Sequence, residues 1–434
     1  MTFRAIRTHD RDSSRSEVFG IWGHFHGSNL GDDLVVAVLI DAIRQRRSGV
    51  EIVGISMAPT DTKLRHGVET LPINPGQDIG SSGSVSAQDV PDRPGALRRV
   101  VRKVPGARGT FRLWREMEFL TRSFAALRSI DRLIVAGSGQ IQDVWGPWTH
   151  PYTTFRWALL ARLTRVEMVL PSVGVGPITS GLSRLFVRKS VEWAGFVSVR
   201  DEGSASVLRA IGVRRQLAVC PDMGWAYVQS KPHTDPPDGV TAVVGVNVMP
   251  HEDPRYWPSG EQSQYHEHTT KMASFVANLL RRGDRVLLFS SQTRADRLVA
   301  DDLRQDLSDR GLADHPHLDW AVDRIETVEQ LLETVSRCDY VVAARFHSVL
   351  LPLSLGIPTI GLAYQPKTAE LLAQVGLSTY CFDIGSFELE ELEAALKKLR
   401  AEDRRERRAK LLDRGRGFRA AVEEQFDVLF ATQA

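Results

Sequence analysis

Short apolar runs recur along the whole chain, and each ends in a turn rich in glycine or polar residues before a segment with helical spacing. The runs occupy residues 18–22, 51–55, 132–136, 167–171 and 195–199 in the first half, and 241–248, 285–289, 340–344, 358–363 and 379–382 in the second. Strands separated by helix-length segments are typical of parallel βαβ units, whose strands are buried on both faces. The pattern predicts an α/β fold with two doubly wound, Rossmann-like domains.

Two segments without periodicity suggest where the domains begin and end. Residues 229–240 are rich in Pro, Asp and Gly, which is linker composition, and residues 74–96 form a Gly-, Ser- and Pro-rich insertion that we expect to be a mobile loop. A length of 434 residues also favours two domains. We therefore expect a disordered tail over 1–17, an N-terminal Rossmann-like domain over 18–230, a C-terminal one over 240–385, and C-terminal helices over 386–434.

Composition excludes several classes of function. The charge balance of 55 Lys+Arg against 53 Asp+Glu gives a net charge of +2, too small for a dedicated nucleic-acid binder. The cysteines, Cys220, Cys338 and Cys381, are widely spaced, which fits neither a disulfide scaffold nor a zinc site and favours a reducing, cytoplasmic compartment. The sequence contains no HExxH motif and no DxD between apolar flanks, so we expect no metal site.

The strongest chemical signal is the segment Val-Val-Ala-Ala-Arg-Phe-His-Ser at residues 341–348, a buried strand that stops at a cation, a histidine and the start of a helix. Ligands of doubly wound sheets bind beyond the carboxyl ends of the strands, where helix amino termini favour anions. Arg345 can hold a carboxylate or phosphate through paired hydrogen bonds, and His347 can transfer a proton near neutral pH. The alternative is a buried arginine satisfied by carbonyls beside a capping histidine.

The next strand, at 358–364, ends in Tyr364 and is followed by Gln-Pro-Lys, with Lys367 in the first turn of a helix. If the two strands are neighbours, Lys367 lies on the same rim as Arg345 and His347, and Tyr364 is a candidate substrate contact. Three convergent cations favour a compact polyanion such as a phosphorylated carboxylate.

Glycine-rich turns supply further candidates. The turn at 23–33 contains Asn29, Gly31 and Asp32, which can either contact a ligand or cap the following helix. The turn at 136–143 contains Gly139 and Gln140 but lacks the last glycine of the dinucleotide fingerprint, and no GxxxxGK[ST] loop occurs, so we discount NAD and P-loop chemistry.

Arg200 follows another strand, where it can contact an anion or form an ordinary salt bridge with a neighbouring acid. Residues 96–104 carry four cations around one apolar helical face, a pattern typical either of a helix on an anionic membrane or of a solvated helix packed on its own domain.

These motifs, in this order, resemble the polysaccharide pyruvyl transferase family. The matching segments are GSNLGDD, AGSGQIQD, GVGP, VSVRDEGS, the Pro-Asp at 221–222, and ARFHSVLLPLSLGIPTIGLAYQPK, within about residues 18–382. A departure from the family pattern occurs at 137–139, where Gly-Ser-Gly replaces a plainer run of glycines.

The resemblance implies a fold like that of GT-B glycosyltransferases, with two domains facing a cleft. It implies transfer of the pyruvyl group of phosphoenolpyruvate to two hydroxyls of a sugar in a cell-surface polysaccharide or glycolipid, with formation of a cyclic ketal and release of phosphate. The family's Arg-x-His falls on Arg345 and His347, its lysine on Lys367, and its amino-terminal turn on Asn29, Gly31 and Asp32. No cofactor is expected beyond phosphoenolpyruvate as donor substrate.

The expected partners are phosphoenolpyruvate and a sugar acceptor, which a lipid could carry, in a cytoplasmic enzyme with a peripheral contact to the inner membrane face. Two alternatives share the architecture: a glycosyltransferase that uses a nucleotide sugar, and a non-catalytic protein that binds glycans or anions.

Overall fold

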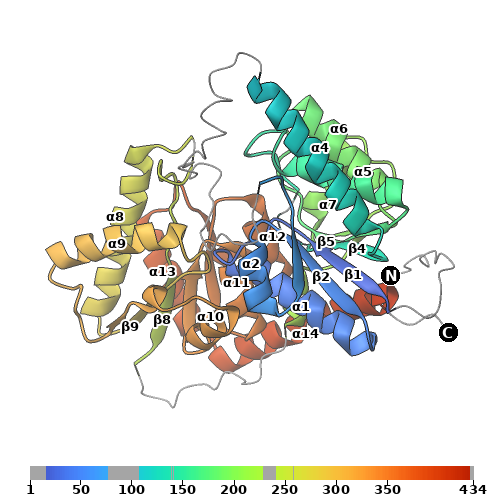
Figure 1. Cartoon of the computed structure of the whole chain (residues 1–434). Helices are drawn as coiled ribbons and strands as arrows, with labels where there is room; N and C mark the ends of the chain where they lie inside the picture. Colours follow the sequence, from blue (N-terminus) through green and yellow to red (C-terminus); the bar gives the residue numbers. More distant parts are fainter. Residues whose placement is uncertain are drawn as a thin grey trace. The chain divides into compact units, whose positions relative to one another are not determined.

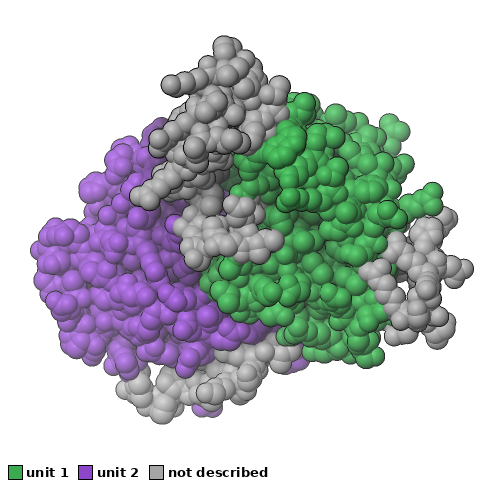
Figure 2. Space-filling view, viewed as in Figure 1, with its two compact units in different colours: residues 1–27, 39–220, 425–434 green, residues 28–38, 221–424 purple. Residues whose placement is uncertain are grey.

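The computed structural model describes residues 16–76, 107–137, 139, 141–227, 241–257 and 259–430. Within these ranges the chain divides into two compact units, coloured separately in Figure 2. Unit 1 comprises the described parts of Met1–Gly27, Leu39–Cys220 and Gln425–Ala434, and unit 2 those of Ser28–Val38 and Pro221–Glu424. The expected linker at 229–240, the basic segment at 96–104 and most of the expected tail and loop lie outside the described residues.

Unit 1 is built on a seven-stranded parallel sheet with the strand order β3-β2-β1-β4-β5-β6-β7. Its central strands are buried over their whole length, which is why they read as continuous apolar runs. The strands are β1 (Val18–Trp22), β2 (Glu51–Ser56), β3 (Glu69–Pro72), β4 (Arg132–Val135), β5 (Glu167–Val173), β6 (Phe196–Val199) and β7 (Ala218–Val219).

Helices follow the strands of unit 1 in alternation. They are α1 (Leu30–Arg46), α2 (Pro59–His66), α4 (Ala107–Leu127), α5 (His150–Thr164), α6 (Gly181–Trp193) and α7 (Glu202–Ala210), of which α1 is shared with unit 2. Helices α4, α5 and α6 pack side by side (Figure 1). Ser180 and Asp201 cap α6 and α7 through their side chains, as serine and aspartate commonly do at helix starts.

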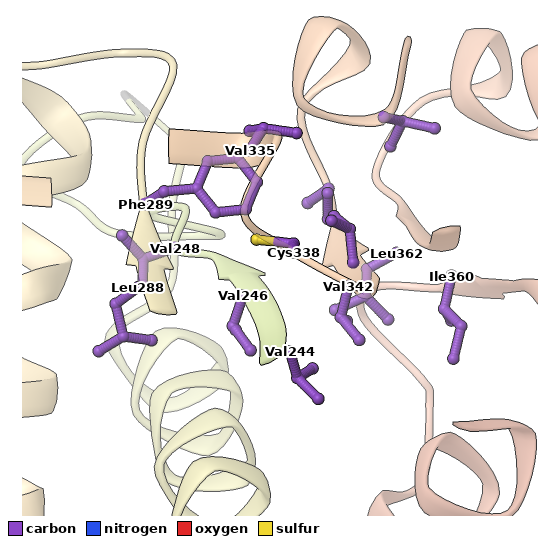
Figure 3. Close-up of a cluster of buried hydrophobic side chains, with 14 of the residues drawn as sticks. Val244, Val246, Val248, Leu288, Phe289, Val335, Cys338, Val342, Ile360 and Leu362 are labelled. Atoms are coloured by element: carbon purple, nitrogen blue, oxygen red, sulfur yellow. The ribbon is translucent and has the colours of Figure 1, made fainter. Parts of the chain in front are cut away.

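Unit 2 contains a six-stranded parallel sheet with the order β10-β9-β8-β11-β12-β13. Its strands are β8 (Val243–Asn247), β9 (Arg285–Phe289), β10 (Leu318–Asp319), β11 (Tyr340–Ala343), β12 (Thr359–Ala363) and β13 (Cys381–Asp383). Val246, Val342 and Cys338 are among the buried side chains of its core (Figure 3). A Cβ at Gly245 would lie 2.7 Å from the sulfur of Cys338, so this strand position requires glycine.

The helices of unit 2 after residue 220 include three short 3-10 turns among longer α-helices. They are η1 (Met223–Ala226), α8 (Gln262–Arg281), α9 (Ala295–Asp309), η2 (Ala321–Asp323), α10 (Val328–Val335), α11 (Phe346–Ser354), α12 (Pro366–Gln374), η3 (Ser378–Tyr380), α13 (Leu389–Ala401) and α14 (Arg404–Phe430). Thr327 and Gln330 form a reciprocal capping box at the start of α10.

The structure adds three short strands to those predicted from the sequence, β3, β7 and β10, each at an edge of its sheet. The division into units also differs from the predicted domain boundaries. Residues 28–38 belong to unit 2, the change of unit in the middle of the chain falls at residues 220–221, and the end of α14 belongs to unit 1. Helices α1 and α14 each run without a break across one of these divisions, so no turn or linker in the sequence marks them.

Both sheets have a point where the chain reverses its direction of strand addition, between β1 and β4 in unit 1 and between β8 and β11 in unit 2. Such switch points are where doubly wound sheets bind ligands. No helix in the described ranges is long and apolar enough to cross a membrane.

Candidate functional site

The switch point of unit 2 brings the end of β8 to the start of α11. The side-chain oxygen of Asn247, the last residue of β8, accepts hydrogen bonds from the backbone N–H groups of Ala344 (3.4 Å) and Arg345 (3.2 Å). These bonds fix the turn that carries Arg345 and His347, the residues predicted to do the chemistry.

Arg345 is held by a buried carboxylate. Its Nε lies 2.9 and 3.0 Å from the two oxygens of Asp296, and a terminal nitrogen also donates to this carboxylate. Burial opposes the charged guanidinium, but Asp296 raises the pKa of Arg345 above its usual range. The expected alternative of an arginine satisfied within the protein is therefore observed, with a carboxylate in place of carbonyls.

The pair is enclosed by further contacts. Asp296 accepts hydrogen bonds from the Ser290 hydroxyl (2.9 Å) and the Gln292 N–H (3.2 Å), and the guanidinium carbon of Arg345 lies 5.8 Å from the centre of the Tyr256 ring. Arg345 was expected to hold a ligand anion through paired hydrogen bonds. In the structure Asp296 balances its charge and already accepts hydrogen bonds from two of its nitrogens.

His347, the second residue of α11, lies beside a different carboxylate. Its Nε2 is 3.5 Å from Oδ1 of Asp222, which also accepts the N–H of Gly224 at 2.9 Å. This Nε2 is buried and has no hydrogen-bond partner among the described residues. The imidazole therefore has an unused polar atom next to a negative charge.

The other side of the His347 ring packs on Gly31. An ideal Cβ at Gly31 would lie 2.0 Å from Nδ1 and 2.5 Å from Cγ of His347, so only glycine leaves room for the ring. The turn containing Gly31 is fixed to the loop after β9, because Leu30 N–H donates to the carbonyl of Ser291 (2.9 Å) and Thr293 N–H donates to that of Ser28 (2.8 Å).

Asn29 and Asp32 interact with each other in this turn. The Asn29 side chain accepts the N–H of Gly31 at 3.2 Å and donates to Asp32 Oδ2 at 2.8 Å. These bonds are those of helix capping, one of the two functions considered for the turn. A contact with substrate stays a prediction.

Lys367 is the second residue of α12, and Tyr364 is the first residue after β12. The Lys367 ammonium lies 5.5 Å from the centre of the Tyr364 ring, and no described residue forms an ion pair with it. Strands β11 and β12 are neighbours, as the prediction required. Lys367 and His347 thus each occupy the first turn of a helix that follows one of these adjacent strands.

The remaining candidates belong to unit 1. Arg200 forms a buried ion pair with Asp201 at 3.1 Å and packs on Gly174, as its salt-bridge alternative anticipated. Gly139 is half-buried, and Gln140 lies outside the described residues.

The sequence pointed to only one of the two acidic residues that contact Arg345 and His347. Asp222 is part of the Pro-Asp segment of the family resemblance but carried no assigned role, and its neighbour His347 follows more than a hundred residues later. Asp296 carried no signal, because nothing in the local sequence links it to Arg345. Across the described ranges, no group of three or more His, Cys, Asp or Glu side chains is arranged to hold a metal ion.

Residues 29–366 match the sequence profile described as Polysaccharide pyruvyl transferase. The chain belongs to the polysaccharide pyruvyl transferase family. This matched range begins within the turn that supports His347 and ends one residue before Lys367, so it contains most of the motif residues that suggested the family.

A named bacterial protein is similar in sequence over most of this chain. The amylovoran biosynthesis protein AmsJ of Erwinia amylovora is 22% identical over 386 residues, which cover 84% of this chain and 87% of AmsJ. The family membership supports a polysaccharide-modifying transferase.

Solved structures resemble the chain over most of its length. They include S. aureus MnaA with UDP (TM-score 0.56, 12% identity, 95% and 96% of the two chains) and a putative UDP-N-acetylglucosamine 2-epimerase of Listeria monocytogenes (0.55, 13%, 94% of each). Anabaena Alr3699/HepE with UDP and glucose also matches (0.53, 12%, 95% and 96%). At such identities the likeness concerns the fold alone, and it confirms the predicted GT-B-like class.

Proposed function

We propose that this member of the family transfers the pyruvyl group of phosphoenolpyruvate to two hydroxyls of a sugar in a cell-surface polysaccharide or glycolipid. The observation that carries the proposal is His347, whose buried Nε2 lies without a hydrogen-bond partner in the described structure, 3.5 Å from Asp222, at the amino terminus of a helix. The family membership supplies the reaction class.

The donor would bind between the first turns of α11 and α12. Helix amino termini present unpaired N–H groups and a positive partial charge, which suit the phosphate and carboxylate of phosphoenolpyruvate. Lys367 adds a full charge that no described carboxylate neutralises. Arg345 would hold the turn in place through Asp296, which leaves Lys367 as the main side-chain grip.

The reaction has a defined proton balance. The methylene carbon of phosphoenolpyruvate gains a proton, a sugar hydroxyl attacks the resulting cationic carbon, the C–O bond to phosphate breaks, and a second hydroxyl closes the ketal. The two hydroxyl protons are released: one replaces the proton given to carbon, and the other leaves with phosphate. A single acid–base group can give the first proton and recover it from a hydroxyl.

His347 is the group that we assign to this exchange. Asp222 would orient the imidazole and balance its charge while the ring carries the proton, and Gly31 would keep the ring in place. Asn29, Asp32 and Tyr364 in unit 2, and Gly139, Gln140 and Arg200 in unit 1, stay candidates for contacts to the substrates.

A nucleotide-sugar glycosyltransferase is the second candidate, favoured by the UDP-bound proteins of similar fold. The two reactions release different products. The purified protein should be incubated with phosphoenolpyruvate or with UDP-sugars, each together with a panel of sugar glycosides. Acceptor-dependent phosphate release, with a product heavier by pyruvate minus water, supports pyruvyl transfer; UDP release alone contradicts it, and release of neither indicates a binding protein.

A further inference from the structure

The outer side of α4 exposes large apolar side chains in one stripe. Leu113, Met117, Leu120 and Phe124 follow one another at intervals of three or four residues, which places them on one face of the helix. Leu113, Trp114, Met117 and Phe124 are between 36% and 64% exposed, and Leu163 at the end of the neighbouring helix α5 is 60% exposed. Side chains of this size are seldom exposed in such a cluster without a partner.

A groove joins the stripe to α5. It has a volume of about 400 Å³ and is lined mostly by apolar side chains, among them Leu120 and Phe124 from α4 and Phe155, Leu159 and Leu163 from α5. The two helices pack side by side in Figure 1. The stripe and the groove therefore form one apolar surface, which we call the α4–α5 face.

Arginines surround the end of this face that carries Phe124 and Leu163. Arg128, Arg162 and Arg165 are exposed, and none of them forms an ion pair with a described residue. The acids of α4, Glu116 and Glu118, are each paired with an arginine, Arg156 and Arg122. The face thus combines exposed apolar groups with uncompensated positive charge.

We propose that the α4–α5 face binds the surface of an anionic lipid bilayer. The apolar stripe would enter the region between headgroups and acyl chains, the groove would take part of an acyl chain, and Arg128, Arg162 and Arg165 would contact lipid phosphates. A second copy of the chain is a poorer occupant, because a two-fold contact through this face would take these unpaired arginines out of water in both copies without supplying a carboxylate from the face. The proposal is independent of the reaction that the enzyme catalyses.

The first test is sedimentation of the full-length protein with vesicles of phosphatidylcholine, with and without phosphatidylglycerol. We expect binding to the anionic vesicles that weakens with salt, and a loss of about tenfold or more in affinity when Leu113, Met117 and Phe124 are replaced together by Gln. Leu64→Gln is the control, since Leu64 is an 80% exposed leucine on α2. Equal binding by the triple variant and the control overturns the proposal.

The second test separates charge from the apolar contact. Replacing Arg128, Arg162 and Arg165 by Gln should abolish the preference for anionic vesicles, whereas replacing Arg44, Arg214 and Arg405 by Gln, with the same change in net charge, should preserve it. These control arginines are exposed and also lack ion pairs with described residues. Identical behaviour of the two triple variants contradicts the assigned face.

Insertion itself can be followed through Trp114. Vesicles with brominated acyl chains should quench part of the tryptophan fluorescence of the wild type, and the Trp114→Phe variant should lose that part while still binding. Undiminished quenching in Trp114→Phe would show that another surface binds lipid. Self-association of the wild type without vesicles, abolished in the Leu113/Met117/Phe124 variant, would show that the face joins two copies of the chain. Each result overturns the proposal without affecting the assay for pyruvyl transfer.

Discussion

Gly31 and His347 are in such close contact that the absence of one side chain determines the position of the other. A Cβ on Gly31 would lie 2.0 Å from the imidazole Nδ1. The neighbouring turn is fixed by backbone hydrogen bonds to residues 291 and 293, so the ring is the part that must move when space is lost.

Gly31→Ala should therefore lower the turnover of pyruvyl transfer by about tenfold to a hundredfold by displacing His347, while helix α1 itself tolerates alanine. Steady-state kinetics measure the effect, and Gly417→Ala, at a helix position with nothing within 4 Å of the added carbon, serves as control. In the His347→Ala background, Gly31→Ala should cost nothing further; a full additional loss would show that Gly31 acts elsewhere.

His347→Ala should reduce turnover by about a hundredfold or more, the usual contribution of a positioned proton-transfer group, with a smaller effect on phosphoenolpyruvate affinity. Asp222→Asn keeps an oxygen for the Gly224 N–H and removes the charge beside Nε2, so turnover should fall by about tenfold with donor affinity preserved. Calorimetry and kinetics on the same preparations separate the two. Parallel loss of affinity and turnover in His347→Ala would make it a binding residue.

Lys367→Met should weaken phosphoenolpyruvate binding by about tenfold or more, because a charge-assisted contact is lost. Thermal stability should stay at the wild-type value, since no described carboxylate is left without its partner. Lys397→Met, an exposed lysine on α13, is the matched control for net charge. Unchanged affinity for phosphoenolpyruvate would show that its phosphate does not bind at the start of α12.

Substitutions of Arg345, unlike that of Lys367, should lower the stability of the fold. Arg345→Ala leaves Asp296 buried without its counter-charge, which commonly costs about 3–5 kcal/mol of folding free energy. Arg345→Lys keeps the charge but cannot reproduce the paired geometry, so it should also be destabilising. Urea unfolding followed by circular dichroism measures both variants. Wild-type stability combined with lost affinity for phosphoenolpyruvate would show that Arg345 binds the donor directly.

Acid should destabilise both units through buried histidines. Burial lowers the pKa of His150 in unit 1 to about 4 and that of His268 in unit 2 to about 3. Below about pH 6.5 these histidines bind protons in the unfolded chain but stay neutral in the folded protein. The free energy of unfolding should therefore fall by about 1.4 kcal/mol for each histidine per unit decrease in pH.

The decrease should continue until the pH reaches each folded value. His150→Gln and His268→Gln should each remove one part of the slope when urea unfolding is compared at pH 7 and pH 5. His266→Gln, at an exposed position of α8, is the control. An unchanged slope in both buried variants would assign the acid sensitivity to other groups.

The strands that carry the site could be predicted because burial on both faces makes them continuous apolar runs. Strands β1 and β9 have the predicted bounds. Strands β3, β7 and β10 lie at sheet edges, where short strands need little apolar sequence, so they could not be predicted in the same way. The position of Lys367 after the strand next to Arg345 followed from the general geometry of parallel sheets.

The residues that contact the predicted site residues were harder to predict from the sequence. Asp296 is 49 residues from Arg345 in the chain, and its burial depends on the packing of α9 against the rest of unit 2. The contact of Gly31 with His347 joins segments that sequence composition assigns to different domains. Motif order indicated that both matter, and only the fold shows that they touch.

Helix α1 has a consequence for how members of the family can exchange parts. Its residues up to Val38 belong to unit 2, and its remainder belongs to unit 1, so unit 2 is formed by two separate segments of the chain. A recombination event in the segment 229–240 would keep His347 from one parent and take the glycine against which it packs from the other. Chimeras joined there inherit a working contact only when both parents carry the same turn, and a peptide of residues 28–38 becomes the natural complement for a fragment that begins at Pro221.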